Sequence, residues 1–240
     1  MGKNPASRAF FIAVLLTVIL PFVPILKWGL LPFDLLNTHL HEMFHAIAAV
    51  VTGGQVDHIE VYRNGEGLTL TRGGIVPIIL MAGYLGASLF GALMVMTCRS
   101  DRSSVIWLRV LAVLVLLSNI LWVRGDVVGW PLGFAWPIVI IFLTMRVRGN
   151  YLLFAAQFLA VQQCLNSIKS LRDLVLLSGS NVTTDAQLLA NDTHVPAIVW
   201  AILWMAVSVF GIVMAMIRIN RQPKSASASA SARAGESAEN

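Results

Sequence analysis

The stretch that decides the architecture is residues 34–54, which read DLLNTHLHEMFHAIAAVVTGG. An aspartate opens this stretch and a glycine pair closes it, and these residues favour the beginning and the end of a helix. We therefore predict a helix from Asp34 to Thr52, about 27 Å long for about 18 residues. One face of this helix is apolar at steps of three or four residues, which is typical of packing against an apolar environment.

The opposite face of the predicted helix is polar or small. It carries Asn37, Thr38, His41, His45, Ala48 and Thr52. Because His41 and His45 lie four residues apart, their imidazoles stand one helical turn from each other. Ionisable side chains inside a hydrophobic protein are costly, and they indicate a functional site.

The composition of the whole chain places this helix in a membrane protein. Of the 240 residues, 57 % are hydrophobic and 12 % are charged, whereas a soluble domain carries about 25 % charged residues. These values exclude an ordinary water-soluble enzyme. The net charge of +5 does not indicate a nucleic-acid partner, because the basic residues lie at span ends, in short loops and in the C-terminal tail.

Six long apolar runs are candidate membrane spans, since about 20 apolar residues cross a bilayer as a helix. They cover residues 9–31, 75–97, 105–123, 130–144, 151–168 and 195–217. The first run is too long for a signal-peptide core, and we expect it to be retained. Gly83, Ala87 and Gly91 lie four residues apart in the second run, where they would let two helices pack closely. The predicted fold class is an all-α membrane protein with about six transmembrane helices, and residues 1–220 form one membrane domain.

The distribution of basic residues predicts the orientation in the membrane. Lys and Arg lie in the loops 99–102 and 146–148 and in the tail, and the positive-inside rule then places these segments and the C-terminus in the cytoplasm. The N-terminal residues are also basic, and we expect the stretch 34–52 to enter the membrane without emerging cleanly. Residues 221–240 are Ser, Ala and a few charges, so they are predicted to be a disordered tail.

The spacing His41-Glu42-Met43-Phe44-His45 has a chemical meaning. Two imidazoles at i and i+4 point the same way and can bind one zinc ion. Glu42, about 100° further round the helix, can reach a water on that ion, whose pKa zinc lowers toward about 7. Glu42 would take the proton of this water as general base and later deliver it to the leaving nitrogen. The pattern therefore predicts peptide hydrolysis. The alternative, that the two histidines and the glutamate bind no metal, would place three polar groups in a membrane segment without a function.

The motif and the residues after it resemble the site-2 protease family of intramembrane zinc metallopeptidases, and more closely its smaller bacterial and plant branch. The likeness spans residues 30–205 and includes the glycine pair, a hairpin-like stretch at 56–71, and the segments 166–174 and 185–190. It implies a multi-pass protein of a bacterial cell membrane that cuts a membrane-anchored protein within or beside the bilayer. The larger family takes its third zinc ligand from a motif with an Asp-Gly pair, and this chain has no such pair.

Asp173 is our first choice for the third zinc ligand, because a catalytic zinc takes three protein ligands and keeps one open position. It follows Gln162, Asn166 and Ser170 at steps of four, four and three residues, and this polar face could turn toward the histidines. The alternative for Asp173 is an ion pair with Lys169, four residues earlier.

Asp185 is the second choice. Thr183-Thr184-Asp185 before an apolar run is typical of a helix start, where capping and the helix dipole favour an acidic residue without any metal. The remaining candidates are Asp126, Asp192, His194, His39 and His58. Asp126 is assigned to a loop, His194 and His39 to the membrane interface, and His58 to the solvent-facing part of the hairpin.

Residues 56–71 predict two short strands around an Asn64-Gly65 turn. One interpretation is a loop that merely folds into a hairpin. The other is an edge that pairs with an unwound substrate segment, because a peptide bond inside a helix is protected from attack.

The function predicted from the sequence is a zinc-dependent intramembrane endopeptidase with His41, His45 and Asp173 on the metal. The main alternative is a membrane protein that binds metal and chaperones other spans without proteolysis. A transporter would show internal inverted repeats, and the sequence has none that we detect. The oligomeric state is left open.

Overall fold

The computed structural model describes residues 5–124, 127–177 and 183–220. Asp126 and the predicted tail, residues 221–240, lie outside this part of the chain. The elements are α1 (Pro5–Ile19), η1 (Leu20–Phe22), α2 (Pro24–Val51), β1 (Gln55–Val61), β2 (Gly67–Arg72), α3 (Val76–Thr97), α4 (Asp101–Leu121), α5 (Gly129–Arg146), α6 (Asn150–Leu177), α7 (Asp185–Thr193) and α8 (Ala197–Asn220). The fold is therefore mostly helical with one small hairpin.

The predictions for the first span and for the start of the metal-site helix were wrong. The first helix does not continue to residue 31, because the chain turns at η1 and starts a new helix at Pro24. Proline lacks a backbone N–H and is favoured in the first turn of a helix, so Pro24 favours the start of a new helix at this position. Asp34 consequently lies inside α2 and is not its N-cap; its carboxylate lies 3.8 Å from Lys169 Nζ on α6.

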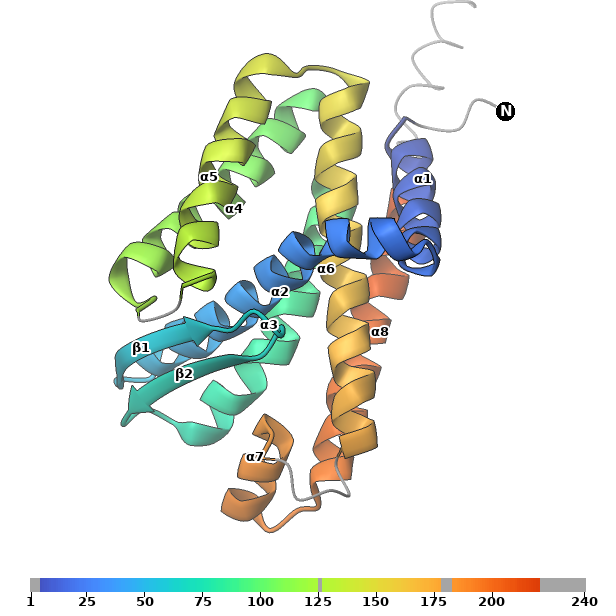
Figure 1. Ribbon diagram of the computed structural model, residues 1–240. Helices are drawn as coiled ribbons and strands as arrows, with labels where there is room; N and C mark the ends of the chain where they lie inside the picture. The colour runs from blue at the N-terminus through green and yellow to red at the C-terminus, as the bar shows by residue number, and fades with distance from the viewer. Residues whose placement is uncertain (1–4, 125–126, 178–182, 221–240) are drawn as a thin grey trace, which may run out of the picture.

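The long helices form a bundle that α2 crosses (Figure 1). In this bundle α6 packs against α1, α3 and α8, and α4 pairs with α5. The crossing helix α2 packs against α3 and against both strands of the hairpin. This position brings the His41–His45 segment to the junction of the bundle and the hairpin.

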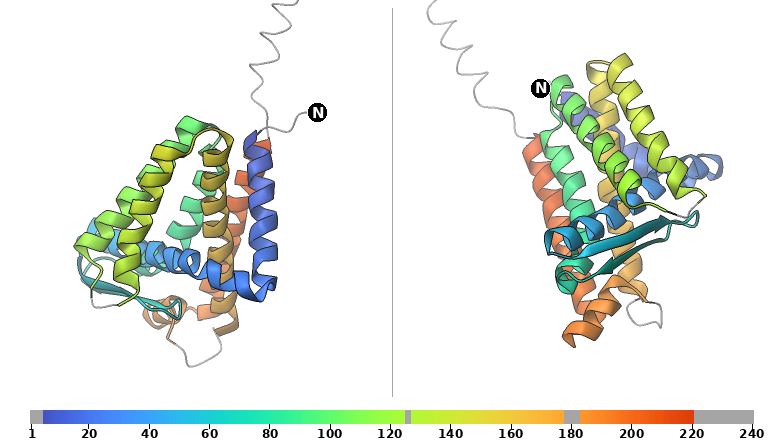
Figure 2. Two further views of the ribbon diagram at one scale, coloured as in Figure 1. Left: turned by 45° about the horizontal axis from the view of Figure 1, so that its top comes forward. Right: turned by 90° about the vertical axis from the view of Figure 1, so that its left-hand side faces the viewer.

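The beginning of α1 and the end of α8 lie at the same end of the bundle (Figure 2). Ser7 Oγ donates a hydrogen bond to Asn220 Oδ1 at 2.7 Å. The loops before α4 and α6 also meet there, since the Gly149 backbone N–H donates to Asp101 Oδ1 at 2.7 Å. The basic segments therefore gather at one end, while the hairpin and α7 lie toward the other (Figure 1).

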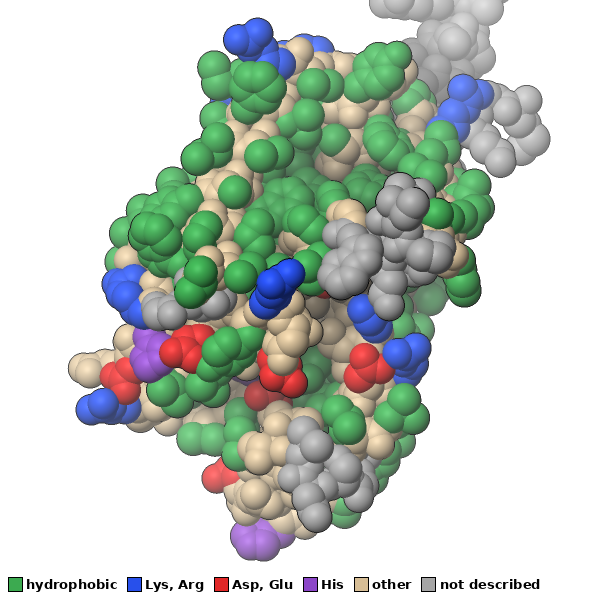
Figure 3. All heavy atoms as spheres, viewed as in Figure 1, with side chains coloured by type: hydrophobic (Ala, Val, Ile, Leu, Met, Phe, Trp, Pro, Cys, Tyr) green, Lys and Arg blue, Asp and Glu red, His purple; other side chains and the backbone are tan. Residues whose placement is uncertain are grey.

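Four helices are long and apolar enough to cross a membrane among the described residues: α3, α4, α5 and α8. The apolar helix α1 has only 15 residues, and α6 has 28 residues but buries several glutamines. The helical membrane architecture is thus confirmed in this coarser form, and the count of six spans is not. Hydrophobic side chains cover the face over α4 and α5, and acidic side chains gather near the hairpin and α7 (Figure 3).

The predicted hairpin is confirmed, with Gly65 at φ +90° in the Asn64-Gly65 turn. The outer edge of β1 is also covered, because Ile59 N–H donates to Trp122 O at 2.9 Å and Ile59 O accepts from Arg124 N–H at 3.0 Å. Within the described residues β2 pairs only with β1. One edge of β2 is therefore left without a partner strand.

Candidate metal centre

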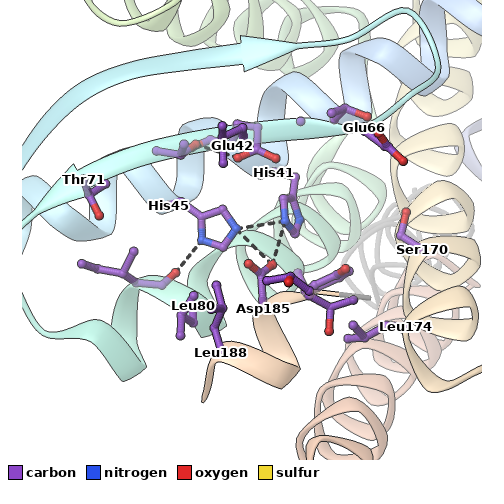
Figure 4. A pocket seen from close by; sticks show the side chains of 18 of the residues that line it. His41, Glu42, His45, Glu66, Thr71, Leu80, Ser170, Leu174, Asp185 and Leu188 are labelled. Atoms are coloured by element: carbon purple, nitrogen blue, oxygen red, sulfur yellow. Dashed lines mark hydrogen bonds and ion pairs between the residues drawn. The ribbon is translucent and has the colours of Figure 1, made fainter. Parts of the chain in front are cut away.

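Three side chains from α2 and α7, two helices far apart in the sequence, converge beside the C-terminal half of α2 (Figure 4). The Nε2 atoms of His41 and His45 lie 2.9 Å apart. Asp185 Oδ2 lies 3.2 Å from His41 Nε2 and 3.3 Å from His45 Nε2. Donor atoms that each lie about 2.0–2.1 Å from a tetrahedral zinc ion lie about 3.3 Å from one another. The three side chains therefore have the chemistry and the spacing of a zinc site.

The orientation of His45 is fixed by a second contact of its ring. Its Nδ1 lies 2.6 Å from the backbone oxygen of Ile79 on α3. A carbonyl accepts from N–H, so this contact assigns a proton to Nδ1, and Nε2 can bind a metal once its own proton is released. Such a partner is typical of histidines that bind metals.

A close approach of α3 completes this side of the centre. A Cβ atom at Gly83 would lie 2.4 Å from His45 Nε2 and 2.6 Å from His41 Cε1. From the sequence we assigned Gly83 to helix packing alone. The structure adds a second role, because the packing partner at this position is the pair of candidate ligands.

We expect Gly83→Ala to lower zinc affinity by about 10–100-fold although it removes no ligand. The added methyl group would displace both imidazoles, and even changes in the groups that orient a ligand typically cost about 10–100-fold in metal affinity. Zinc content and zinc affinity of the purified protein measure the effect. Gly29→Ala, on the helix α2 that carries the two histidines, is the matched control, because a Cβ at Gly29 would meet nothing within 4 Å beyond its own stretch of helix. Unchanged zinc affinity in Gly83→Ala would contradict the close approach.

Asp185 owes its position to the start of α7. Thr184 caps this helix, its Oγ1 accepting from Gln187 N–H at 3.2 Å, and Asp185 is the first helical residue. Burial alone would raise the pKa of the Asp185 carboxyl, but the charge of His45 and the hydrogen bonds from both imidazoles outweigh burial and hold this pKa well below its usual range. The side chain is therefore an anionic carboxylate, the form that binds a metal.

The structure does not bring Asp173, our first choice, to the histidines. Its Oδ1 accepts from the neighbouring Arg172 at 2.7 Å and 3.0 Å, and its side chain is 45 % exposed. The alternative pair with Lys169 is not formed either, since Lys169 faces Asp34. Asp173 lies on the wall of the same cavity as the three converging residues.

The other candidates lie away from the three converging donors. His39 points to α4, where its Nε2 lies 2.7 Å from Ser118 Oγ. His58 lies 3.4 Å from Glu60 on β1. His194 ends α7 in an exposed left-handed conformation with φ +61°, and Asp192 lines the cavity.

The side chain of Glu42 projects from α2 against β2. Its carboxylate Oε2 accepts from Thr69 Oγ1 at 2.6 Å, and a Cβ at Gly67 would lie 2.4 Å from its Oε1. The side chain of Glu42 is only 5 % exposed. Sequence reasoning missed Gly67 and Thr69; the one available signal was a glycine within a predicted strand, which often marks a close approach of another group.

Glu42 and the three converging residues share one cavity of about 1090 Å³. Its walls come from α2, the hairpin, α3, α6 and α7. Pockets that enclose small ligands have volumes of about 300–1,000 Å³. The cavity can therefore accommodate a short peptide segment.

A family model described as Peptidase M50B-like matches residues 9–215. The chain belongs to this family. M50 peptidases are the site-2 protease family of membrane zinc metallopeptidases, so the resemblance seen in the sequence is confirmed at the family level. The M50B-like membership implies a metallopeptidase, and the His41, His45 and Asp185 group could hold its metal. No curated protein and no solved structure matches the chain.

Proposed function

We propose that this M50B-like protein is a zinc-dependent intramembrane endopeptidase that cuts membrane-anchored proteins. The observation that carries the proposal is the convergence of His41, His45 and Asp185 beside a buried Glu42 in one cavity. Zinc, when bound, supplies a Lewis acid that polarises the scissile carbonyl and makes water more acidic.

His41, His45 and Asp185 would hold the zinc. Two imidazoles and one carboxylate are a common ligand set of catalytic zinc, and they leave one coordination position for chemistry. We favour Asp185 over Asp173 because the Asp185 carboxylate lies against both imidazoles, whereas the Asp173 carboxylate lies against Arg172. The short helix α7 thus contributes a functional residue from outside the motif.

Glu42 would act as the general base. It would take a proton from the attacking water and deliver it to the leaving nitrogen, which completes hydrolysis of the peptide bond. The hydrogen bond from Thr69 occupies Oε2 and orients the carboxylate. The second oxygen, Oε1, has no hydrogen bond to the residues described here and is available to water.

The free edge of β2 would align the substrate. Ile59 directs its backbone N–H and C=O to residues 122–124, away from β2. Its partner Thr69 must then direct its own N–H and C=O away from β1, because the two residues of such an antiparallel pair point outward together. Thr69 also lines the cavity. An unwound, extended substrate segment could add to this edge and gain backbone hydrogen bonds beside the metal centre.

We also propose a multi-pass protein whose C-terminus lies in the cytoplasm. Arg99, in the loop before α4, donates to the Arg218 carbonyl at the end of α8, and the loop before α6 donates to Asp101, which supports one side for all three segments under the positive-inside rule. The bacterial cell membrane as the location stays a prediction from the sequence.

Removal of the metal tests the proposed hydrolysis. We expect the protein, reconstituted in lipid vesicles with a fluorescent single-span peptide whose helix is weakened by glycine, to cut this peptide within or beside the span. A zinc chelator should stop the cleavage, and added zinc should restore it, because the chelated protein lacks its Lewis acid. Mass spectrometry of the products locates the cut. Cleavage that persists in the chelator would show that hydrolysis does not depend on zinc, and a zinc-loaded protein that cuts no such peptide would favour the non-proteolytic alternative.

A further inference from the structure

Tyr84 on α3 lies next to the metal centre. The preceding residue, Gly83, lies directly against the rings of His41 and His45. The Tyr84 ring packs edge-on against the His41 ring, with 4.4 Å between the centroids and 77° between the planes. Tyr84 also lines the cavity that contains Glu42 and the three candidate ligands.

The Tyr84 ring is held from a second direction by α8. It stacks on the indole of Trp204 with a centroid distance of 5.5 Å and an interplanar angle of 23°. Trp204 is fully buried, in a cluster that includes Leu171 and Leu189. The ring is therefore packed between His41 and the buried Trp204, and these contacts fix the position of the hydroxyl oxygen.

The hydroxyl group of Tyr84 makes no hydrogen bond to any residue that the structure describes. Two other hydroxyl groups on the cavity wall are engaged: Thr69 donates to Glu42 at 2.6 Å, and Thr38 donates to the Gly65 carbonyl at 2.8 Å. Tyr84 is half-buried on the cavity wall, so its O–H can donate to an acceptor on a molecule that enters the cavity.

We propose that Tyr84 is a further catalytic residue whose O–H donates a hydrogen bond to the oxygen of the scissile carbonyl. This inference rests on the proposed peptidase function. When water adds to the carbonyl carbon, its C=O π bond breaks and the oxygen gains negative charge, while the water proton goes to Glu42. Tyr84 keeps its own proton throughout. A fixed donor aimed at such a developing charge is worth about 10²–10³-fold in kcat.

Tyr84→Phe tests the hydroxyl group, because phenylalanine keeps the ring contacts with His41 and Trp204. In the zinc-loaded protein in lipid vesicles, we expect kcat to fall by about 10²-fold with little change in KM or in zinc affinity. A phosphinic peptide, which mimics the tetrahedral carbon, should bind more weakly by a similar factor, while an uncleaved substrate analogue binds as before. Tyr151→Phe is the matched control, since Tyr151 is 80 % exposed at the start of α6 and does not line the cavity; it should change neither measurement.

Tyr84→Ala removes both the ring and the hydroxyl group, so its comparison with Tyr84→Phe separates the two contributions. If Tyr84→Phe matches the parent protein in cleavage and in phosphinic-peptide binding, the proposal is overturned, whatever Tyr84→Ala does. If Tyr84→Phe loses zinc, Tyr84 is a positioning residue for His41 and the proposal is again overturned. Failure of the peptidase function has a different pattern: the zinc-loaded parent protein would then neither cut the peptide nor bind the phosphinic compound.

Discussion

Replacing Glu42 by glutamine is expected to lower kcat by about 10²–10⁴-fold, the usual contribution of a general base, with zinc still bound. Glutamine has nearly the same shape as glutamate, and its amide oxygen can still accept the hydrogen bond from Thr69 Oγ1. The neutral amide cannot take a proton from water. The variant should therefore keep the fold and the metal while it loses hydrolysis.

Single-turnover cleavage of the membrane-anchored peptide and zinc content, measured on the same preparation, test this expectation. Glu60→Gln is the matched control, because Glu60 lies on β1 beside His58 and does not line the cavity. It should behave as the parent protein does. A Glu42→Gln protein that retains full cleavage would exclude Glu42 as the base, and a loss of zinc would mean that Glu42 helps to hold the metal.

Asp185→Asn is expected to lower zinc affinity by more than about 100-fold, because loss of a ligand should cost more than the 10–100-fold typical of its outer partners. The carboxylate contributes a negative charge and a ligand oxygen, which lies 3.2 Å from His41 Nε2 and 3.3 Å from His45 Nε2. Asparagine is still accepted in the first turn of α7, which Thr184 caps, so the helix should be retained.

Asp173→Asn provides the comparison for Asp185→Asn, since it makes the same change on the same cavity wall. We expect its zinc affinity to match that of the parent protein, because its carboxylate pairs with Arg172. Titration of both variants with zinc against a competing chelator measures the difference. The reverse ranking, with Asp173→Asn weakened and Asp185→Asn unchanged, would assign the third ligand to α6.

Features set by neighbouring residues could be predicted from the sequence. The i and i+4 spacing of His41 and His45 places both rings on one face of any helix, and the Asn64-Gly65 turn specifies a hairpin locally. The start of α2 was mispredicted because Asp34 has the chemistry of an N-cap, while the actual boundary lies at Pro24, ten residues earlier.

The third ligand could not be chosen from the sequence, because it depends on contacts between distant elements. His41 and Asp185 are 144 residues apart in the chain. Both Asp173 and Asp185 follow patterns compatible with a site, and only the packing of α6 and α7 against the rest of the protein separates them. The roles of Gly83 and Tyr84 are equally non-local, since they arise where α3 meets α2 and α8.

The location of Asp185 on a nine-residue helix also has a consequence for stability. An ion shared by α2 and α7 would cross-link early and late parts of the chain, much as a disulfide closes a long loop. Its binding free energy would then add to the free energy of folding. Loss of the metal would remove this cross-link, and α7 would then depend on the packing of Ala186 and Leu189 in the core.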